Sequence, residues 1–180
     1  MHETHATEQY FFAPPTLDEM AELVERYERP ALLCCPMLGR HLWERFQSPR
    51  FTPARKPWST TILDIDQRFA NVPGFAIWDI HRPVRLPVRP DIIVCDPPFY
   101  TIGLDRLFRA FGTLANGNPD IPILVTYPER HAAKILGTMA PFGLTKTDYY
   151  PKYVTVSPSV GIVAFSNLPR EAWPRSGAET

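Results

Sequence analysis

The sequence predicts an α/β fold with a mostly parallel β-sheet that closes in a C-terminal antiparallel hairpin. Apolar segments of strand length alternate with segments of helical period along most of the chain. Residues 92–95 are continuously apolar, which is typical of a strand that is covered on both faces. Two adjacent strand-like segments follow near the C-terminus. The expected architecture is a Rossmann-like sheet with one antiparallel strand.

The first helix is expected to begin at Thr16, because Thr16 and Glu19 have the spacing of a capping box, and Pro30 marks its end. Turn residues, prolines and changes of period delimit the elements that follow. They are predicted strands at 31–35, 60–65, 75–80, 91–95 and 121–127, and predicted helices at 37–47, 104–116 and 129–139.

The hairpin is predicted to pair residues 144–156 with residues 160–166 around the turn Ser157-Pro158-Ser159. We expect one domain over residues 1–167. Residues 168–180 are expected to form a loose tail.

The composition excludes several classes of protein. Lys plus Arg and Asp plus Glu number 19 each, so no net charge draws the chain to nucleic acid, although a local patch remains open. No apolar run reaches the length of a membrane span and no signal peptide is visible, so no membrane partner is expected. Cys34, Cys35 and Cys95 lie in apolar segments without metal-binding spacing. They indicate buried thiols in a cytoplasmic protein, with no metal site.

The strongest functional signal is Asp96-Pro97-Pro98-Phe99, which directly follows the apolar run. The prolines lack amide hydrogens and must end the strand, which places Asp96 where open α/β sheets bind ligands. The Asp96 carboxylate and the Pro97 carbonyl can accept the hydrogens of an amine, and Phe99 can stack on a flat or cationic group. This arrangement suits methyl transfer to nitrogen by alignment and fixed dipoles. The alternative is an ordinary strand exit with an Asx turn.

Two further acids follow predicted strands. Asp66 ends the second strand, where an acid can hold ribose hydroxyls of a cofactor, and we prefer it to Asp64. Asp79 follows Trp78 at the end of the third strand and can accept from an adenine amine. A helix cap or a solvated turn explains either acid equally well.

Two further segments bear on how a cofactor would be bound. The first strand ends in Cys34-Cys35-Pro36, without the glycine-rich turn that nucleotide-binding folds normally have, so a cofactor would be held differently. The aromatic segment Tyr10-Phe11-Phe12 is either a clamp on the sheet or a lid over the cofactor.

Two basic loops, Arg50–Lys56 and Arg82–Arg89, are most simply solvated connections. They are also the places where an RNA or an acidic protein partner would dock.

The chain resembles a known family in Tyr10–Phe12, in the exit at Pro36, in the Asp66-x-x-Phe69 string, in Trp78-Asp79 and in Asp96–Phe99, which occur there in the same order. It is the probable N6-adenine methyltransferase family, which includes the lysine methyltransferases of translation elongation factor 1-alpha. The resemblance implies a seven-stranded class I methyltransferase fold and S-adenosylmethionine as cofactor.

Carried over by position, the resemblance implies that Asp96, Pro97, Pro98 and Phe99 line the acceptor site. It implies that Asp66 and Asp79 face the cofactor, near the exit at Pro36, and that Tyr10, Phe11 and Phe12 close over it. The chain departs from the family at Tyr150–Tyr153, where the family usually has a histidine after a proline and then an Asn-Glu-Phe string.

The predicted function is therefore an S-adenosylmethionine-dependent N-methyltransferase acting on a protein lysine or on the exocyclic amine of adenine. A lysine must first lose a proton, which a neighbouring carboxylate opposes, so adenine stays open as the acceptor. The alternative is a non-catalytic methyltransferase-like module that binds a protein or RNA partner.

Overall fold

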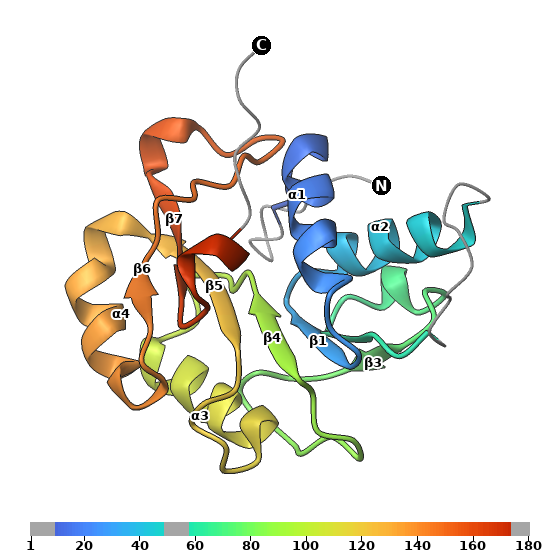
Figure 1. Cartoon of the computed structure of the whole chain (residues 1–180), viewed down its shortest axis with the longest axis horizontal. Coiled ribbons are helices and arrows are strands. Elements are labelled where there is room, and N and C mark those ends of the chain that lie inside the picture. The colour runs from blue at the N-terminus through green and yellow to red at the C-terminus, as the bar shows by residue number, and fades with distance from the viewer. Residues whose placement is uncertain (1–9, 49–57, 174–180) are drawn as a thin grey trace.

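The computed structural model describes residues 10–48 and 58–173, and within them it contains a seven-stranded sheet with helices on both faces (Figure 1). The strands are β1 (Pro30–Leu33), β2 (Thr61–Asp64), β3 (Phe75–Ile77), β4 (Ile92–Cys95), β5 (Ile123–Pro128), β6 (Thr145–Lys146) and β7 (Ile162–Ser166). The helices are α1 (Pro14–Val24), α2 (Pro36–Gln47), α3 (Leu104–Ala115) and α4 (Ala132–Thr138). The 3-10 turns are η2 (Gln67–Phe69), η3 (Glu129–His131), η4 (Ala140–Phe142), η5 (Pro158–Val160) and η6 (Arg170–Ala172).

The strand order in the sheet is β3-β2-β1-β4-β5-β7-β6. Strands β1 to β5 are mutually parallel, and β7 runs antiparallel to both of its neighbours. The prediction of a mostly parallel sheet with one antiparallel strand is confirmed. Because the chain builds outward from β1 in one direction and from β4 in the other, the topology switches between these two strands.

Alternate side chains of the central strands enter two separate cores. Ala31 and Leu33 of β1 pack on the side of α3 and α4, whereas Leu32 packs on the side of α1 and α2. All four residues of β4 are buried, which agrees with a strand covered on both faces. Pro97 and Pro98 then end the pairing, since neither has an amide hydrogen to donate.

The C-terminal hairpin is much shorter than predicted. Strand β6 has two residues, and its pairing with β7 extends only to Tyr149, whose carbonyl accepts from Ala164 N at 2.9 Å. Pro151 then breaks the ladder, and Tyr153 bridges to Phe12 instead. The expected strand over residues 144–156 was wrong because its second half pairs with the N-terminal segment.

The expected capping box at α1 was also wrong. The helix begins at Pro14, a residue suited to the first turn, and Ala13 is its N-cap. Thr16 Oγ1 accepts from Lys152 N at 2.8 Å, and Glu19 Oε2 accepts from the Tyr149 hydroxyl at 2.6 Å. Both side chains therefore fasten α1 to the segment that follows β6.

The first residues of the predicted loose tail, 168–173, pack against the fold. Leu168 is buried, and Trp173 donates its indole N–H to the Leu168 carbonyl at 2.9 Å while packing on the core beside α1. Residues 174–180 lie outside the described part of the chain.

Gly74 fixes the entry to β3, and we predict that Gly74→Ala is strongly destabilising. Its φ is +83°, its carbonyl accepts from Ile62 N at 2.8 Å, and an added Cβ would lie 2.0 Å from the Thr60 carbonyl oxygen. We expect the free energy of unfolding in urea to fall by on the order of 3 kcal/mol. The control is Gly117→Ala, with φ of +81° and no atom within 4 Å, which should cost about 1 kcal/mol. Equal losses in the two variants would contradict this prediction.

Candidate active site

A cavity of about 570 Å³ lies at the carboxyl ends of the parallel strands. It spans the topological switch point between β1 and β4, which is where open α/β sheets bind their ligands. Parallel strands bring their carboxyl ends to one edge, so segments distant in sequence meet there. The walls are residues 64–68 after β2, 78–81 after β3 and 96–99 after β4, together with Tyr10, Cys34, Thr101, Ile102 and Tyr153.

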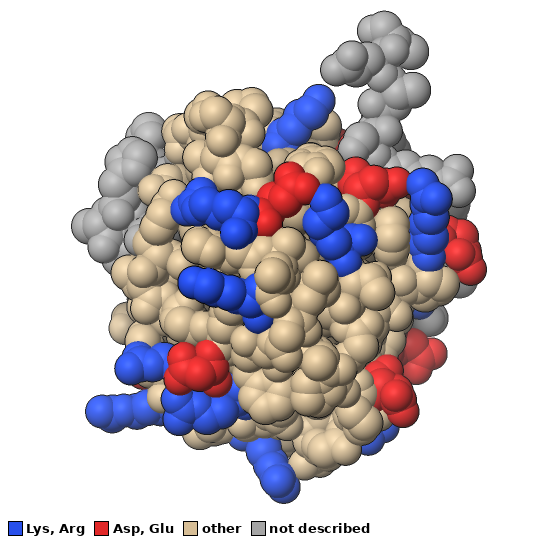
Figure 2. Space-filling model, turned by 90° about the vertical axis from the view of Figure 1, so that its left-hand side faces the viewer, with Lys and Arg blue, Asp and Glu red and all other residues tan. Residues whose placement is uncertain are grey.

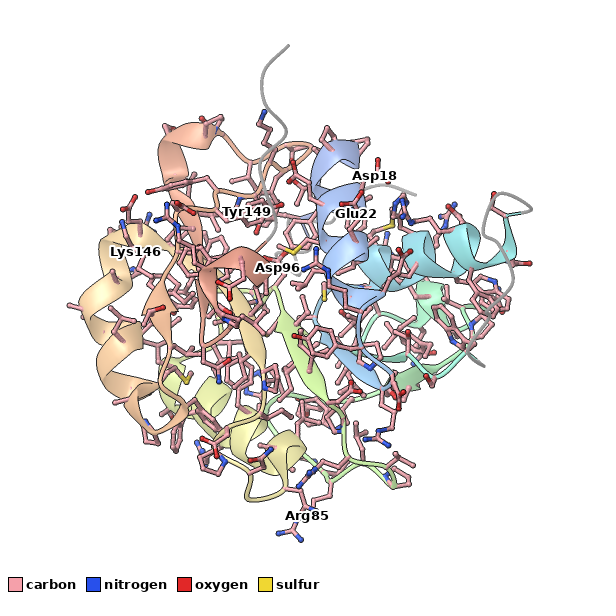
Figure 3. All side chains as sticks on the ribbon, in the orientation of Figure 1. Asp18, Glu22, Arg85, Asp96, Lys146 and Tyr149 are labelled. Carbon is pink, nitrogen blue, oxygen red and sulfur yellow. The ribbon has the colours of Figure 1, made fainter. Side chains whose placement is uncertain are left out.

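Asp96 lies at the end of β4 in the middle of the molecule (Figure 3). Its amide donates to the Leu33 carbonyl at 3.1 Å, which ties it to β1. Its Oδ1 accepts two hydroxyl donors, Tyr153 at 2.6 Å and Thr126. Burial raises the pKa of the Asp96 carboxyl to about 7, although both hydrogen bonds favour the ionised form. The carboxyl can therefore accept N–H donors or take up a proton near neutral pH.

The loop after Asp96 is stiff and aromatic. The Pro98 carbonyl accepts from Ile102 N at 2.9 Å, so the chain turns at once toward α3. The half-buried ring of Phe99 lies 5.0 Å from Tyr100 and 6.2 Å from Tyr127, between ring centroids. Pro97, Pro98 and Phe99 all line the cavity, so the four predicted acceptor-site residues are brought together.

Of the two acids at the end of β2, Asp64 is more deeply buried than Asp66. It is the last residue of the strand and is buried, and its Oδ1 accepts from Asp66 N at 2.8 Å. Burial raises the pKa of Asp64 to about 6. Asp66 caps η2 through Arg68 N at 3.0 Å and pairs with the Arg68 guanidinium at 2.7 Å. Both acids line the cavity, but the preferred residue, Asp66, has its carboxylate engaged by Arg68.

Asp79 lines the same end of the cavity after β3. Its Oδ1 accepts from His81 N at 2.8 Å, which fixes the turn. Trp78 is buried beside it and donates its indole N–H to the Val84 carbonyl at 3.0 Å. Asp79 therefore faces the cavity from a position set by local hydrogen bonds.

The turn after β1 has a left-handed residue although it contains no glycine. Cys34 adopts a left-handed conformation with φ of 57°, a region that favours glycine, and it lines the cavity. Its amide donates to the Leu63 carbonyl at 2.9 Å. Pro36 is the first residue of α2 and is buried outside the cavity wall, so the geometry gives it a packing position rather than a cofactor contact.

The N-terminal aromatic segment divides between two positions. Tyr10 lines the cavity, as a lid would. Phe11 and Phe12 are buried outside its wall, where Phe11 packs edge-on against Phe69 at 6.3 Å and Phe12 contacts the ring of Tyr153 at 5.1 Å. Their position is that of a clamp, and their predicted contact with the cofactor has no support in this geometry.

Three residues of the site were missed or undervalued in the sequence. Asp64 was set aside in favour of Asp66. Thr126 is a polar residue inside the buried strand β5, which is a weak signal for a functional role. Tyr153 had no local signal, because the contact that it makes joins positions 57 residues apart.

The described basic loop, Arg82–Arg89, extends outward from the cavity wall. The Arg50–Lys56 loop lies outside the described residues. Arg82, Arg85 and Arg89 are exposed, and Figure 3 shows Arg85 at the edge of the molecule far from Asp96. On the face shown in Figure 2, basic and acidic side chains are interspersed over a largely uncharged surface. In the described part of the chain, no helix could span a membrane and no cluster of metal ligands occurs.

Several solved structures resemble this chain at low sequence identity. A S-adenosylmethionine-dependent methyltransferase from Clostridium acetobutylicum is 14% identical, with 84% of this chain and 89% of that chain covered and a TM-score of 0.52. NodS, an N-methyltransferase from Bradyrhizobium japonicum, is 12% identical, with coverage of 85% and 95% and a TM-score of 0.47. The first likeness supports the class I methyltransferase fold. No curated protein sequence matches.

A family model described as probable N6-adenine methyltransferase matches residues 3–167. The family and the fold together support S-adenosylmethionine as the cofactor, as predicted. Since the match spans most of the 180 residues, the chain belongs to the probable N6-adenine methyltransferase family.

Proposed function

We propose that this protein is a S-adenosylmethionine-dependent N-methyltransferase whose acceptor is an amine nitrogen, either of a protein lysine or of adenine. One observation carries the proposal. The Asp96 carboxylate follows a buried strand at the topological switch point and lines the same cavity as Phe99. A hydrogen-bond acceptor next to an aromatic ring is what the recognition of an amine requires.

The cavity fits the cofactor. Its volume of about 570 Å³ lies in the range of small-molecule sites. Asp64 and Asp79 enter from β2 and β3 and can accept from hydroxyl and amine groups of a nucleoside, and exposed Ile65 offers an apolar face between them. The left-handed turn at Cys34 brings the backbone to the cavity between the β2 and β4 ends. When bound, S-adenosylmethionine supplies an electrophilic methyl group on sulfur.

The protein would contribute alignment and charge rather than a strong base. Asp96 and the Pro97 carbonyl accept the hydrogens of the acceptor amine and hold its lone pair toward the cofactor end of the cavity. Phe99 excludes water and packs on the acceptor. With a pKa of about 7, the Asp96 carboxyl can take the proton that the nitrogen loses as it forms its new bond to carbon.

The choice between the two acceptors depends on this carboxyl. Adenine needs only hydrogen-bond acceptors at its amine. Lysine must arrive neutral, and the raised pKa of Asp96 makes the carboxyl a better proton acceptor than an exposed aspartate, although the ionised form would still stabilise the ammonium. Labelled cofactor in a host lysate, followed by mass spectrometry, would distinguish protein from nucleic acid as the product.

The alternative is a non-catalytic module that docks an acidic protein or RNA through the exposed Arg82–Arg89 loop. Calorimetry with S-adenosylmethionine separates the two hypotheses, because only the enzyme needs to bind it. The free cysteines among the described residues, Cys34, Cys35 and Cys95, are consistent with the expected cytoplasmic setting.

We predict that Asp96→Asn lowers methyl transfer about 100-fold while the dissociation constant for S-adenosylmethionine changes less than about 3-fold. The amide keeps the shape of the side chain but loses the charge and the ability to take a proton. The control is Asp105→Asn, an exposed carboxylate on α3 outside the cavity wall. Wild-type turnover by Asp96→Asn would remove Asp96 from the site.

We predict that Asp64→Asn weakens S-adenosylmethionine binding about 10-fold or more, and that Asp66→Asn weakens it less. The reason is that Asp64 is buried at the strand end, whereas Asp66 already pairs with Arg68. Calorimetric titration of both variants gives the order directly. The opposite order would restore the assignment made from the sequence.

The ionisation of Asp96 should also make the free energy of unfolding depend on pH. Its folded pKa of about 7 lies above its ordinary value of 3.8, so the folded state binds this proton more tightly than the unfolded state. The resulting stabilisation is complete below about pH 4 and is lost as pH rises through 7. Between pH 5 and 8, we expect the wild type to lose on the order of 2 kcal/mol more unfolding free energy than Asp96→Asn. Parallel pH dependences in urea unfolding would show that this carboxyl has an ordinary pKa.

A further inference from the structure

The two oxygens of the Asp96 carboxylate differ in their hydrogen-bond donors. Tyr153 and Thr126 both donate to Oδ1, and within the described residues no hydrogen bond reaches Oδ2. No fully buried side-chain oxygen or nitrogen of the described residues lacks a partner, so Oδ2 must have accessible surface. Asp96 lines the cavity, and of its two carboxylate oxygens Oδ2 is the one that has no donor among the described residues.

Two donors on one oxygen set the rotation of the carboxylate. A carboxylate can accept on both oxygens, and two donors that reach one oxygen from different directions fix the plane of the group and leave the second oxygen for a ligand. Thr126 holds Oδ1 from β5, and Tyr153 holds it from the segment after β6. Burial and the Asp96 charge raise the pKa of the Tyr153 hydroxyl well above its ordinary value, so it remains a donor across the physiological range.

The N-terminal segment holds Tyr153 in place. Ala13 N donates to the Lys152 carbonyl at 2.8 Å and Val154 N donates to the Phe11 carbonyl at 2.9 Å, on either side of the bridge between Phe12 and Tyr153. The rings of Phe12 and Tyr153 also pack together. The preceding residue of this segment, Tyr10, lines the same cavity.

We propose that Tyr153 is a positioning residue of the acceptor site, which through its hydroxyl turns Oδ2 of Asp96 toward the acceptor amine. The inference rests on the proposed methyl transfer. It concerns less than the whole reaction, because the Tyr153 hydroxyl affects only the orientation and the ionisation of the Asp96 carboxyl group.

The test compares Tyr153→Phe with Tyr150→Phe. Both variants delete a hydroxyl that donates to a carboxylate, but Tyr150 is exposed and its partner is Glu129, outside the cavity wall. The first readout is the titration of the Asp96 side-chain carbon by NMR. Because the Tyr153 hydrogen bond favours the ionised form, its loss should move the midpoint upward by about one pH unit, and Tyr150→Phe should leave it unchanged.

The second readout is the kinetics. At pH 7 we expect Tyr153→Phe to lower kcat about 10-fold with less than about 3-fold change in the acceptor KM. Part of the loss should disappear above pH 8, where the carboxyl ionises in both proteins. S-adenosylmethionine affinity should remain within about 3-fold of wild type. A uniform loss at every pH, or an equal effect of Tyr150→Phe, would indicate a structural role and overturn the inference.

The two proposals fail separately. If no methyl transfer occurs in any variant, the proposed function is wrong, yet the NMR titration still shows whether Tyr153 controls the carboxyl. If transfer occurs and the midpoint does not move in Tyr153→Phe, the positioning role alone is wrong. Should Tyr153→Phe fail to fold, 3-fluorotyrosine at position 153 keeps the ring and makes the hydroxyl a stronger donor, so it must move the midpoint downward, and an unmoved midpoint would overturn the inference.

Discussion

The structure depends on the burial of one carboxylate at the point where its sheet changes direction. Asp96 ends a strand whose four residues are fully buried, and the two prolines after it prevent the sheet from continuing. A carboxylate in this position loses solvation, which by itself would neutralise it. Hydroxyl donors from Thr126 and Tyr153 partly offset that cost. The balance leaves a pKa of about 7, in the range where a carboxyl can both accept hydrogen bonds and exchange a proton.

The same constraint organises the rest of the cavity. The topological switch separates the ends of β2 and β3 from the end of β4, so the acids Asp64 and Asp79 lie on one side of β1 and Asp96 on the other. A ligand that reaches both sides must cross the end of β1. There the chain turns sharply at Cys34 instead of at a glycine. A left-handed turn is needed for close approach, and glycine is only the least costly way to make it.

Short-range signals were sufficient for the parallel strands and for placing Asp96–Phe99 at a strand end that lines the cavity. The continuous apolar run before Asp96 and the prolines after it specify a buried strand with an abrupt end, and these depend on neighbouring residues alone. The incorrect predictions, in contrast, concern side chains whose partners lie far away in the sequence. Thr16 and Glu19 have the spacing of a capping box, but their partners lie at Lys152 and Tyr149, more than a hundred residues away. Helix capping is a local explanation for side chains that here serve a long-range contact.

The error at the predicted hairpin has the same physical origin. Residues 144–156 have the composition of one strand, but Pro151 interrupts it and the chain beyond it finds a second partner in residues 11–13. The hydrophobic periodicity of a segment indicates that it is extended, but it does not indicate which other segment it pairs with. Tyr153 could not be assigned a role for that reason, although it is one residue of the contact that joins the N-terminus to Asp96.

The pairing of residues 11–13 with residues 152–154 connects Tyr10, at one part of the cavity wall, with Tyr153 and Asp96 at another. Tyr10 lines the cavity one residue before Phe11 and three before Ala13, whose backbone bonds hold Tyr153 in register. Under the proposed role of Tyr153, a ligand that packs on Tyr10 would also favour the pairing of residues 11–13 with 152–154, and with it the position of the Tyr153 hydroxyl. Binding energy at one end of the cavity can in this way contribute to alignment at the other, without movement of the sheet. If Tyr153 orients Asp96 as proposed, the N-terminal segment contributes to the acceptor site as well as packing on the sheet.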